Sequence, residues 1–348
     1  MNVADFDFAL PDECIAQSPA EPRGSSRLLV MDRATGAVED TRFTSLSAHL
    51  RPGDLMVVND SRVFPARLLG RRVPSGGAVE CLLLARRGHD EWDALVHPGQ
   101  KLKPGARVAF GGGGDGLEGE VVAMHHFGRR TIRLVSSSGR SADEVIDAIG
   151  HMPLPPYIKR DDTTADRSRY QTVYANARGS VAAPTAGLHF TPDVLASLDA
   201  RGVERVAITL HVGYGTFKPV RSETVEGHTV DPEAYTIGDD AAARVNRALD
   251  EGRRVVAVGT TTTRALESAA IVGHGRVSAG TRMADLFIHP GFAFQVLGGL
   301  LTNFHLPRSS LLMLVAAFGG REPVLRAYAH AVADGYRFYS YGDAMLVG

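Results

Sequence analysis

VAVGTTTTRALESAA, residues 256–270, begins as a buried apolar strand and passes through a hydroxyl-rich turn directly into a helix. In α/β proteins this arrangement places backbone N–H groups and threonine hydroxyls at the carboxyl end of a strand, where ligands usually bind. Thr260 and Thr261 are therefore candidate binding residues, and Arg264 can hold a carboxylate through two parallel hydrogen bonds. A capped helix with a surface arginine, without any bound ligand, explains the same residues equally well.

Helices and strands continue to alternate on both sides of this stretch. Thr191-Pro192-Asp193 combines the cap, the first-turn proline and the acidic residue that begin a helix, and Gly202 ends it. The expected helices are 191–202, 239–252, 309–319 and 322–334, and the expected strands are 27–32, 37–43, 55–59, 203–210, 254–258 and 337–341. This alternation predicts a mainly parallel sheet or barrel with helices outside it.

The middle of the chain has a different texture, with short apolar runs separated by turns. The runs are Arg67–Leu69, Val79–Ala85, Trp92–Val96, Arg107–Phe110, Glu120–Met124 and Thr131–Val135. Strands of this length and spacing predict a small antiparallel β-barrel or sandwich. HMPLPPYIKR, residues 151–160, contains three prolines and should be a stiff, extended connector. We therefore predict a discontinuous α/β domain, residues 1–62 and 151–348, with an inserted β-barrel domain, residues 63–150.

Composition narrows the class of protein. A chain of 348 residues is long enough for two domains, and its net charge of −1 argues against a broad basic surface that coats nucleic acid. No apolar run approaches the ~20 residues that span a bilayer, and the first residues lack a signal-peptide core, so we expect a cytoplasmic protein. Cys14 and Cys81 lie far apart in sequence and indicate neither a disulfide scaffold nor a zinc site.

A glycine-rich run, Gly111–Gly116, matches the dinucleotide-binding pattern literally. That pattern works only when a helix follows at once, because the helix N-terminus holds the pyrophosphate. Residues 117–124 read as a strand instead. A hairpin turn is the better interpretation of the glycines.

Three histidines stand at the edges of predicted elements. His211, in HVGYGTF, follows an apolar strand, while His189 and His305 each precede a helix. A single histidine is usually structural, but three in one domain raise the chance of acid–base chemistry, since histidine titrates near neutrality. Their spacing is not that of a helical metal motif, so we expect no metal.

Basic residues gather where the chain enters and leaves the β-rich insert. Arg62 and Arg67 lie at one crossing, and Lys159, Arg160 and Arg167 lie at the other. If both crossings are close in space, these residues form a basic cleft for RNA phosphates. A solvated arginine face is the alternative interpretation.

The patterns above indicate a two-domain α/β enzyme with a nucleotide-like or anionic ligand. Longer motifs make the interpretation more specific. VAAPTAGLHFT (181–191) and TNFHLPRSSLLMLV (302–315) are highly specific strings, and further matching stretches lie in order along nearly the whole chain. They are 15–30, 51–70, 150–160, 169–175, 208–220, 256–270 and 336–347. In these stretches the sequence resembles the S-adenosylmethionine:tRNA ribosyltransferase-isomerase family of queuosine biosynthesis. It departs from the family at Ser18, where histidine is common, and shows little similarity over 74–144.

The resemblance implies a reaction and a set of partners. The ribosyl group of S-adenosylmethionine passes to 7-aminomethyl-7-deazaguanine at the wobble position of tRNA and is rearranged. Epoxyqueuosine-tRNA forms, and adenine and methionine are released. The co-substrate is consumed, so no cofactor is expected, and the protein should be a monomer or weak homo-oligomer. The resemblance also implies a six-stranded, barrel-like α/β body with an inserted β-barrel.

Within that reaction the candidate residues take roles. The three histidines are candidates for the base and the acid. Thr260, Thr261 and Arg264 would anchor the methionine carboxylate, and Tyr214 or Phe190 would face the sulfonium or the adenine. The basic residues of the two crossings would contact the tRNA backbone. Two alternatives remain: an RNA-binding protein without catalysis, and a methyltransferase that uses the same co-substrate, although its usual glycine-rich motif is not apparent.

Overall fold

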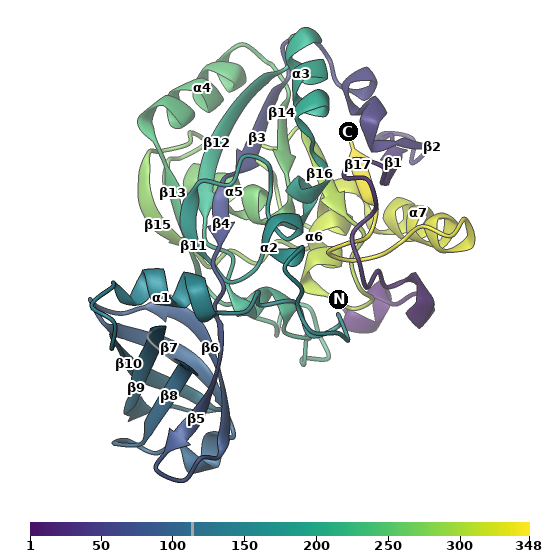
Figure 1. Ribbon diagram of the computed structural model, residues 1–348. Helices are drawn as coiled ribbons and strands as arrows, with labels where there is room; N and C mark the ends of the chain where they lie inside the picture. Colours follow the sequence, from purple (N-terminus) through teal and green to yellow (C-terminus); the bar gives the residue numbers. More distant parts are fainter. Residues whose placement is uncertain (113–114) are drawn as a thin grey trace.

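The computed structural model describes residues 1–112 and 115–348. It contains a mixed α/β body built on a nine-stranded sheet and a closed six-stranded antiparallel barrel that projects from one end of that body (Figure 1). The predicted fold class, an α/β body with an inserted β-barrel, is confirmed. The body differs in detail from the expectation, because its sheet has nine strands of mixed direction where the resemblance implied six.

Each of the six apolar runs predicted as strands lies in one strand of the barrel. These are β5 (Arg67–Val73), β6 (Ala78–Arg86), β7 (Glu91–His97), β8 (Arg107–Gly112), β9 (Asp115–Met124) and β10 (Arg129–Ser136). Alternate side chains point inward, and helix α1 (Ala142–Ile149) packs against β9 and β10. Residues 113–114 of the glycine run lie outside the described residues. A strand, β9, follows that run, as predicted, and not a helix.

Four parallel strands form the middle of the large sheet, in the order β12, β3, β14, β16. The strands of the sheet, from one edge to the other, are β15 (Gly280–Ala284), β13 (Glu233–Ile237), β12 (Glu204–Leu210), β3 (Leu55–Asn59), β14 (Val255–Val258), β16 (Gly299–Asn303), β17 (Ala344–Val347), β1 (Arg27–Met31) and β2 (Val38–Arg42). Antiparallel strands lie toward both edges, so the sheet is mixed and the prediction of a mainly parallel sheet was too simple.

Two apolar layers cover the faces of this sheet, because its central strands alternate residue by residue. Leu55 and Val57 of β3 pack toward one layer, and Met56 and Val58 pack toward the other. The first layer holds α4 (Asp239–Asp250), α5 (Thr260–Val272), α6 (Ser310–Gly319) and α7 (Arg321–Ala333), and the second holds α3 (Pro192–Ala200) and a 3-10 helix (Phe43–His49). Burial of each such aliphatic side chain contributes roughly 1.5–3 kcal/mol. The strands that carry the site are thereby fixed from both faces.

The predicted strand over residues 337–341 was wrong. This segment is a tight turn, and the last strand, β17, begins only at Ala344. The Asp343 carboxylate accepts hydrogen bonds from the backbone N–H groups of Arg27 (2.8 Å) and Arg337 (2.8 Å), and Tyr339 has a positive φ of 75°. These contacts fold the chain back on itself where the aromatic alternation resembled a strand.

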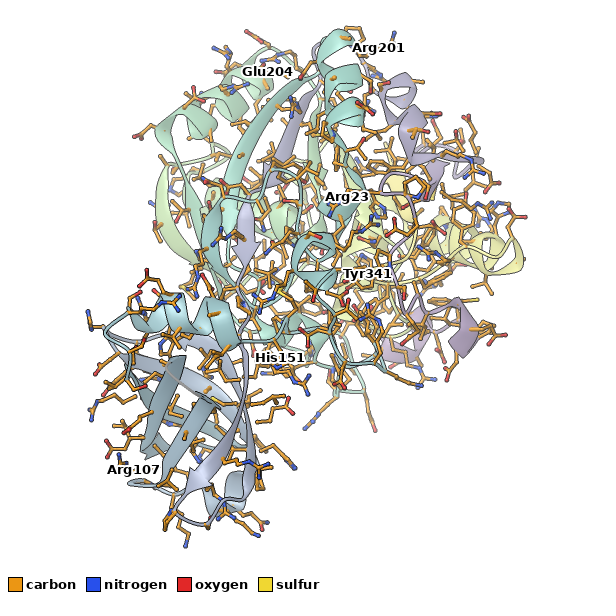
Figure 2. All side chains as sticks on the ribbon, in the orientation of Figure 1. Arg23, Arg107, His151, Arg201, Glu204 and Tyr341 are labelled. Carbon is orange, nitrogen blue, oxygen red and sulfur yellow. The ribbon has the colours of Figure 1, made fainter. Side chains whose placement is uncertain are left out.

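The two crossings to the barrel lie together, as the basic-cleft hypothesis requires. Short strands β4 (Ser61–Val63) and β11 (Ala177–Ser180) pair next to the junction, and Arg67 forms an isolated bridge with His151. Figure 2 shows His151 at the neck between barrel and body and Arg107 at the far end of the barrel. The domain limits at residues 62 and 150 stay a prediction. Within the described residues, no helix has the length and apolar character needed to cross a membrane.

Candidate functional site

A cavity lies where the central parallel strands end. Glu204, at the start of β12, lies at the end of the body far from the barrel, so the carboxyl ends of these strands face the side that carries the barrel (Figure 2). The cavity is lined by Ala182–Ala186, Val212, Thr216, Gly259–Thr261, Thr302–Asn303, His305, Leu311 and Tyr339–Ser340. The position agrees with the general rule that open α/β sheets bind ligands beyond the carboxyl ends of their strands.

Thr260 and Thr261 form the part of the cavity wall that the sequence indicated. They occupy the first turn of α5, after Gly259, whose φ of 94° is one that glycine adopts without strain. The first backbone hydrogen bond of the helix runs from Thr263 N–H to the Gly259 carbonyl, so the earlier N–H groups have no partner within the helix. The hydroxyls of Thr262 and Thr263 bond back to backbone carbonyls. An anion beside Thr260 and Thr261 would therefore meet free N–H donors and the positive end of the helix dipole.

Arg264 does not have the predicted role of carboxylate anchor. Its side chain is buried, and its NH1 forms a 2.6 Å ion pair with Glu233. Its other nitrogens donate to the backbone carbonyls of Asp231, Ala284 and Leu286. The guanidinium is thus occupied inside the protein, and it holds three segments of chain together.

Glu233 extends this brace to the loop beside the cavity. Its Oε1 accepts hydrogen bonds from the backbone N–H of Gly213 (2.8 Å) and the hydroxyl of Thr216 (3.1 Å). Burial raises the pKa of this carboxyl, while Arg264 and the N–H of Gly213 favour the ionised form. The pair therefore sets the path of the 3-10 helix Tyr214–Phe217, which brings Thr216 to the cavity.

The two predicted aromatic contacts lie elsewhere. Phe190 is completely buried in the second apolar layer, where its ring packs edge-on against Phe43 and Tyr174. It is a core residue and cannot face a ligand in this arrangement. Tyr214 lines a different hollow, the groove between the barrel and the segment 152–162.

His305 is the predicted histidine that lines the cavity. Its Nε2 lies 2.8 Å from the Thr302 hydroxyl, and its backbone N–H donates to the hydroxyl of Tyr328. Burial lowers the pKa of His305 to about 3, so the imidazole is neutral at pH 7. A neutral, buried imidazole can accept a proton at one nitrogen or donate one from the other.

His189 lies behind the cavity wall and reaches it through a second residue. Its Nδ1 lies 2.8 Å from the hydroxyl of Ser26, and its Nε2 lies 3.1 Å from Nδ2 of Asn303, which lines the cavity. Burial, with the nearby charges of Arg337 and Arg23, lowers the pKa of His189 to about 3. Both ring nitrogens are therefore occupied by protein groups.

His211 lies at the end of β12 but does not line the cavity. Its ring packs against Gly179, where a Cβ would approach it to 2.7 Å. Burial lowers the pKa of His211, while the nearby Asp60 raises it. The structure therefore brings His305 to the cavity, connects His189 to it indirectly, and leaves His211 outside.

Several residues of the wall escaped the sequence analysis. Asn303 is buried in the wall, and Tyr339 and Ser340 belong to the turn that was predicted as a strand. The Tyr157 hydroxyl is hydrogen-bonded to that of Ser340. The rings of Tyr157 and Tyr339 pack edge to face, with their centroids 4.0 Å apart. The sequence signal that could have found this turn is Gly342-Asp343, because a Cβ at Gly342 would collide with the backbone of Phe338.

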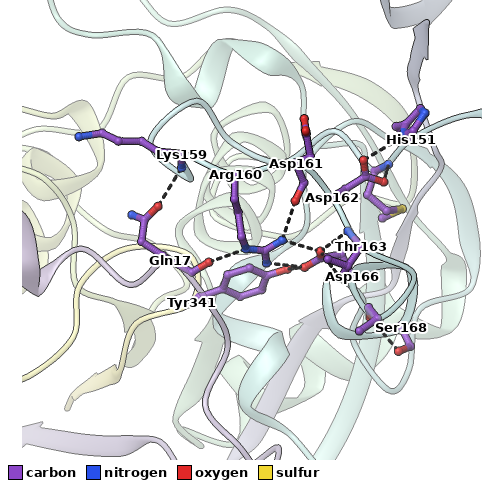
Figure 3. Close-up of polar contacts among 12 residues, drawn as sticks. Gln17, His151, Lys159, Arg160, Asp161, Asp162, Thr163, Asp166, Ser168 and Tyr341 are labelled. Carbon is purple, nitrogen blue, oxygen red and sulfur yellow. Dashed lines mark hydrogen bonds and ion pairs between the residues drawn. The ribbon is translucent and has the colours of Figure 1, made fainter.

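The predicted basic cleft is largely neutralised by the protein itself (Figure 3). Arg160 forms a two-pronged ion pair with Asp166, with both contacts at 2.8 Å, and the hydroxyl of Tyr341 donates to the same carboxylate. Burial alone would raise the pKa of Asp166, but these hydrogen bonds hold it well below its usual range. Arg167 donates to the carbonyls of Asp147 and Gly150. Both guanidinium groups therefore have partners within the protein, and their contact with tRNA phosphates stays a prediction.

The remaining basic residues differ in availability. Arg67 pairs with Glu80 at 2.8 Å. Lys159 is exposed, and its ammonium group lies 3.8 Å from a carboxylate oxygen of Asp12. Arg62 is exposed, and in the part of the chain that the structure describes it has no ion pair within 4.0 Å. Arg62 and Lys159 are thus the predicted cations that remain open to a phosphate.

One group of side chains away from the cavity has the spacing of a metal site. Ligand atoms of Asp40, His330 and Asp334 lie within 4.8 Å of one another. Arg27 already donates to Asp334 at 2.6 Å, and the Tyr336 hydroxyl donates to Asp40 at 2.6 Å. The guanidinium supplies the positive charge that a metal ion would bring, so this group does not point to a metal.

Comparison with known proteins finds relatives that match over nearly the entire chain. A family model described as a queuosine biosynthesis protein matches residues 3–347. S-adenosylmethionine:tRNA ribosyltransferase-isomerases of Desulfitobacterium hafniense and Heliobacterium modesticaldum are 51% and 52% identical, each alignment covering 100% of both chains. The crystal structure of S-adenosylmethionine tRNA ribosyltransferase from Thermotoga maritima has a TM-score of 0.55 at 36% identity, covering 99% of this chain and 100% of that one. The chain therefore belongs to the queuosine biosynthesis protein family, as its motifs indicated.

Proposed function

We propose that this protein transfers and isomerises the ribosyl group of S-adenosylmethionine onto 7-aminomethyl-7-deazaguanine at the wobble position of tRNA. Epoxyqueuosine-tRNA, adenine and methionine are the products. The observation that carries the proposal is a sequence identity of about one half, over the full length of the chain, to proteins named S-adenosylmethionine:tRNA ribosyltransferase-isomerase. The cavity at the carboxyl edge of the sheet supports it, because that position suits a small co-substrate.

The proposed chemistry begins at the sulfonium, whose positive charge makes the neighbouring ribose 5′ protons acidic. Loss of one proton gives an ylide, electrons shift through the sugar, and adenine leaves. The aminomethyl group of the base then attacks, and closure of the epoxide expels methionine. Such a sequence needs a group that moves protons and a site that keeps water from the opened sugar. The buried, neutral His305 is the group in the cavity that best meets the first need.

The donor is oriented by the beginning of α5. The methionine carboxylate lies against the N–H groups and hydroxyls of Thr260 and Thr261, without the third contact that was expected from Arg264. The Arg264–Glu233 brace acts indirectly, by fixing the loop that supplies Thr216. No metal takes part in this scheme, so a chelator should leave the reaction rate unchanged.

A single assay tests the function against its two rivals. The enzyme is mixed with S-adenosylmethionine and tRNA that bears the deazaguanine, and the products are separated by chromatography. Free adenine together with a heavier tRNA nucleoside is the expected result. S-adenosylhomocysteine without adenine would identify a methyltransferase, and an intact co-substrate would leave only an RNA-binding role.

Replacing His305 with glutamine is expected to lower kcat by about 10²-fold, because an acid–base group contributes that much when it is correctly placed. Glutamine can keep a hydrogen bond to the Thr302 hydroxyl, so the fold should persist. Single-turnover adenine release measures the effect. His211→Gln is the matched control, because His211 does not line the cavity, and its kcat should fall far less. Equal losses in the two variants would remove the special role of His305.

The charge-removing double variant Arg62→Gln with Lys159→Gln is expected to weaken tRNA binding and to flatten its salt dependence. Each lost phosphate contact lowers the slope of log K against log salt by about 1. The affinity is measured by filter binding over a range of KCl concentrations. Arg276→Gln, which removes one charge from an exposed side chain already paired with Asp250, serves as the control and should keep the slope. A wild-type slope in the double variant would place the tRNA elsewhere.

A further inference from the structure

Asn303 has an unusual set of contacts for a buried amide. Its side chain is 2% exposed at the end of β16, and it lines the cavity. Its Nδ2 lies 3.1 Å from Nε2 of His189 and 3.1 Å from the carbonyl oxygen of Tyr339. Its Oδ1 is buried with no hydrogen-bond partner within the described residues. A buried acceptor left unpaired destabilises the folded protein, so this oxygen needs an explanation.

The orientation of the amide is set by its neighbours. The Tyr339 carbonyl can only accept, so the Asn303 atom that faces it must be the nitrogen. The opposite orientation would place two oxygens against each other and gain no bond. The unpaired atom is therefore the carbonyl oxygen, and the two hydrogens of Nδ2 point to Tyr339 and His189.

The same geometry fixes the tautomer of His189. Because Asn303 donates through Nδ2, the Nε2 of His189 must accept, and the proton of the neutral ring lies on Nδ1. Nδ1 then donates to the hydroxyl of Ser26, 2.8 Å away. The ring has no lone pair left for a substrate proton. It forms a fixed support that holds Asn303 in one orientation.

We propose that Asn303 is a binding residue for the co-substrate, whose N–H group donates to Oδ1, and that His189 is the positioning residue that aims Asn303. This inference rests on the proposed function and specifies one contact within it. S-adenosylmethionine carries N–H donors at two places, the adenine 6-amino group and the methionine ammonium. Either group can donate to the unpaired oxygen. Because one group is released with adenine and the other with methionine, inhibition by each product identifies which of them makes the contact.

The first test uses Asn303→Leu, which keeps the approximate volume and removes the acceptor together with the two bonds that Nδ2 donates to His189 and Tyr339. The KM for S-adenosylmethionine should rise about 10-fold or more with a smaller change in kcat, as expected when a binding contact is lost. Inhibition by methionine or by adenine should weaken to a similar extent, and the affected product identifies the donor group. Ser268→Ala is the control, because its hydroxyl is another buried, unpartnered group but does not line the cavity. Its KM should match that of the wild type.

The second test separates positioning from catalysis at His189. His189→Phe keeps a ring between Ser26 and Asn303 but removes both hydrogen bonds, and it should raise KM about as much as Asn303→Leu. His189→Gln retains an acceptor and a donor and should recover most of the affinity lost in His189→Phe. The double variant His189→Phe with Asn303→Leu should be no worse than either alone, since both remove one contact. The acidic limb of the kcat–pH profile should persist in His189→Gln.

Three outcomes would overturn the inference while wild-type adenine release continues to support the function. They are an unchanged KM with unchanged product inhibition in Asn303→Leu, additive effects in the double variant, and loss of the acidic kcat limb in His189→Gln. Should Asn303→Leu not fold, Asn303→Ala, which leaves space for water, gives the same comparison, with folding checked by thermal melting. Absence of adenine release from the wild type would instead reject the proposed function itself.

Discussion

Replacing Arg264 with alanine is expected to lower the free energy of unfolding by about 3–5 kcal/mol, the usual cost of leaving a buried charge without its partner. The Glu233 side chain is 4% exposed and would keep only the Gly213 N–H and the Thr216 hydroxyl as donors. Three backbone carbonyls would also lose the donors of the guanidinium. Urea denaturation monitored by circular dichroism measures the change.

Two further variants test this explanation. Removing both charges, with Arg264→Met and Glu233→Gln together, should recover a large part of the loss, because no unpaired charge remains. Arg276→Ala breaks an exposed ion pair with Asp250, each partner 57% exposed, and should cost about 1 kcal/mol or less. A stable Arg264→Ala protein whose KM for S-adenosylmethionine rises would contradict the brace and restore Arg264 as the carboxylate anchor.

The barrel could be predicted from the sequence because each strand carries its own signal. In β6, Val79, Cys81 and Leu83 point inward, while Glu80 and Leu82 are only partly buried. A period of two identifies such a strand without any knowledge of its partners. The central strand β16 was missed, because it is buried on both faces and has no alternation to detect. The equally buried β3 and β14 were predicted only because a recognised turn and a helix end precede them in the sequence.

The site was harder to predict because its contacts join distant parts of the chain. Arg264 finds Glu233 at a separation of 31 residues, and Asn303 finds His189 at a separation of 114. From the sequence, an arginine after a threonine-rich turn suits a ligand as well as it suits a buried carboxylate. What decides between them is the pairing of β13 with β12, which the local pattern does not contain. Thr260 and Thr261 were found because strand, turn and helix are contiguous there.

Acidification from about pH 7.5 to about pH 5 is expected to lower the free energy of unfolding by about 4 kcal/mol through two histidines alone. Burial lowers the pKa values of His189 and His305 to about 3, against an ordinary value of 6.5. Below their ordinary pKa the two histidines are protonated in the unfolded chain but stay neutral in the folded protein. The stabilisation is therefore complete above about pH 6.5 and is lost progressively as the pH falls toward 3. At pH 5 each histidine accounts for about 2 kcal/mol.

The pH dependence of the urea midpoint gives the measurement, and the histidine contribution is isolated by substitution. In His305→Gln the decrease in stability between these two pH values should shrink by about 2 kcal/mol, whatever the variant's stability at pH 7.5. The carboxylates with lowered pKa values, such as Asp166, contribute mainly at lower pH and are common to both proteins. His89→Gln, at an exposed position, is the control and should keep the full decrease. If His305→Gln also keeps the full decrease, the imidazole in the cavity must accept a proton while the protein remains folded, and the assignment of His305 as a buried, neutral acid–base group would have to be abandoned.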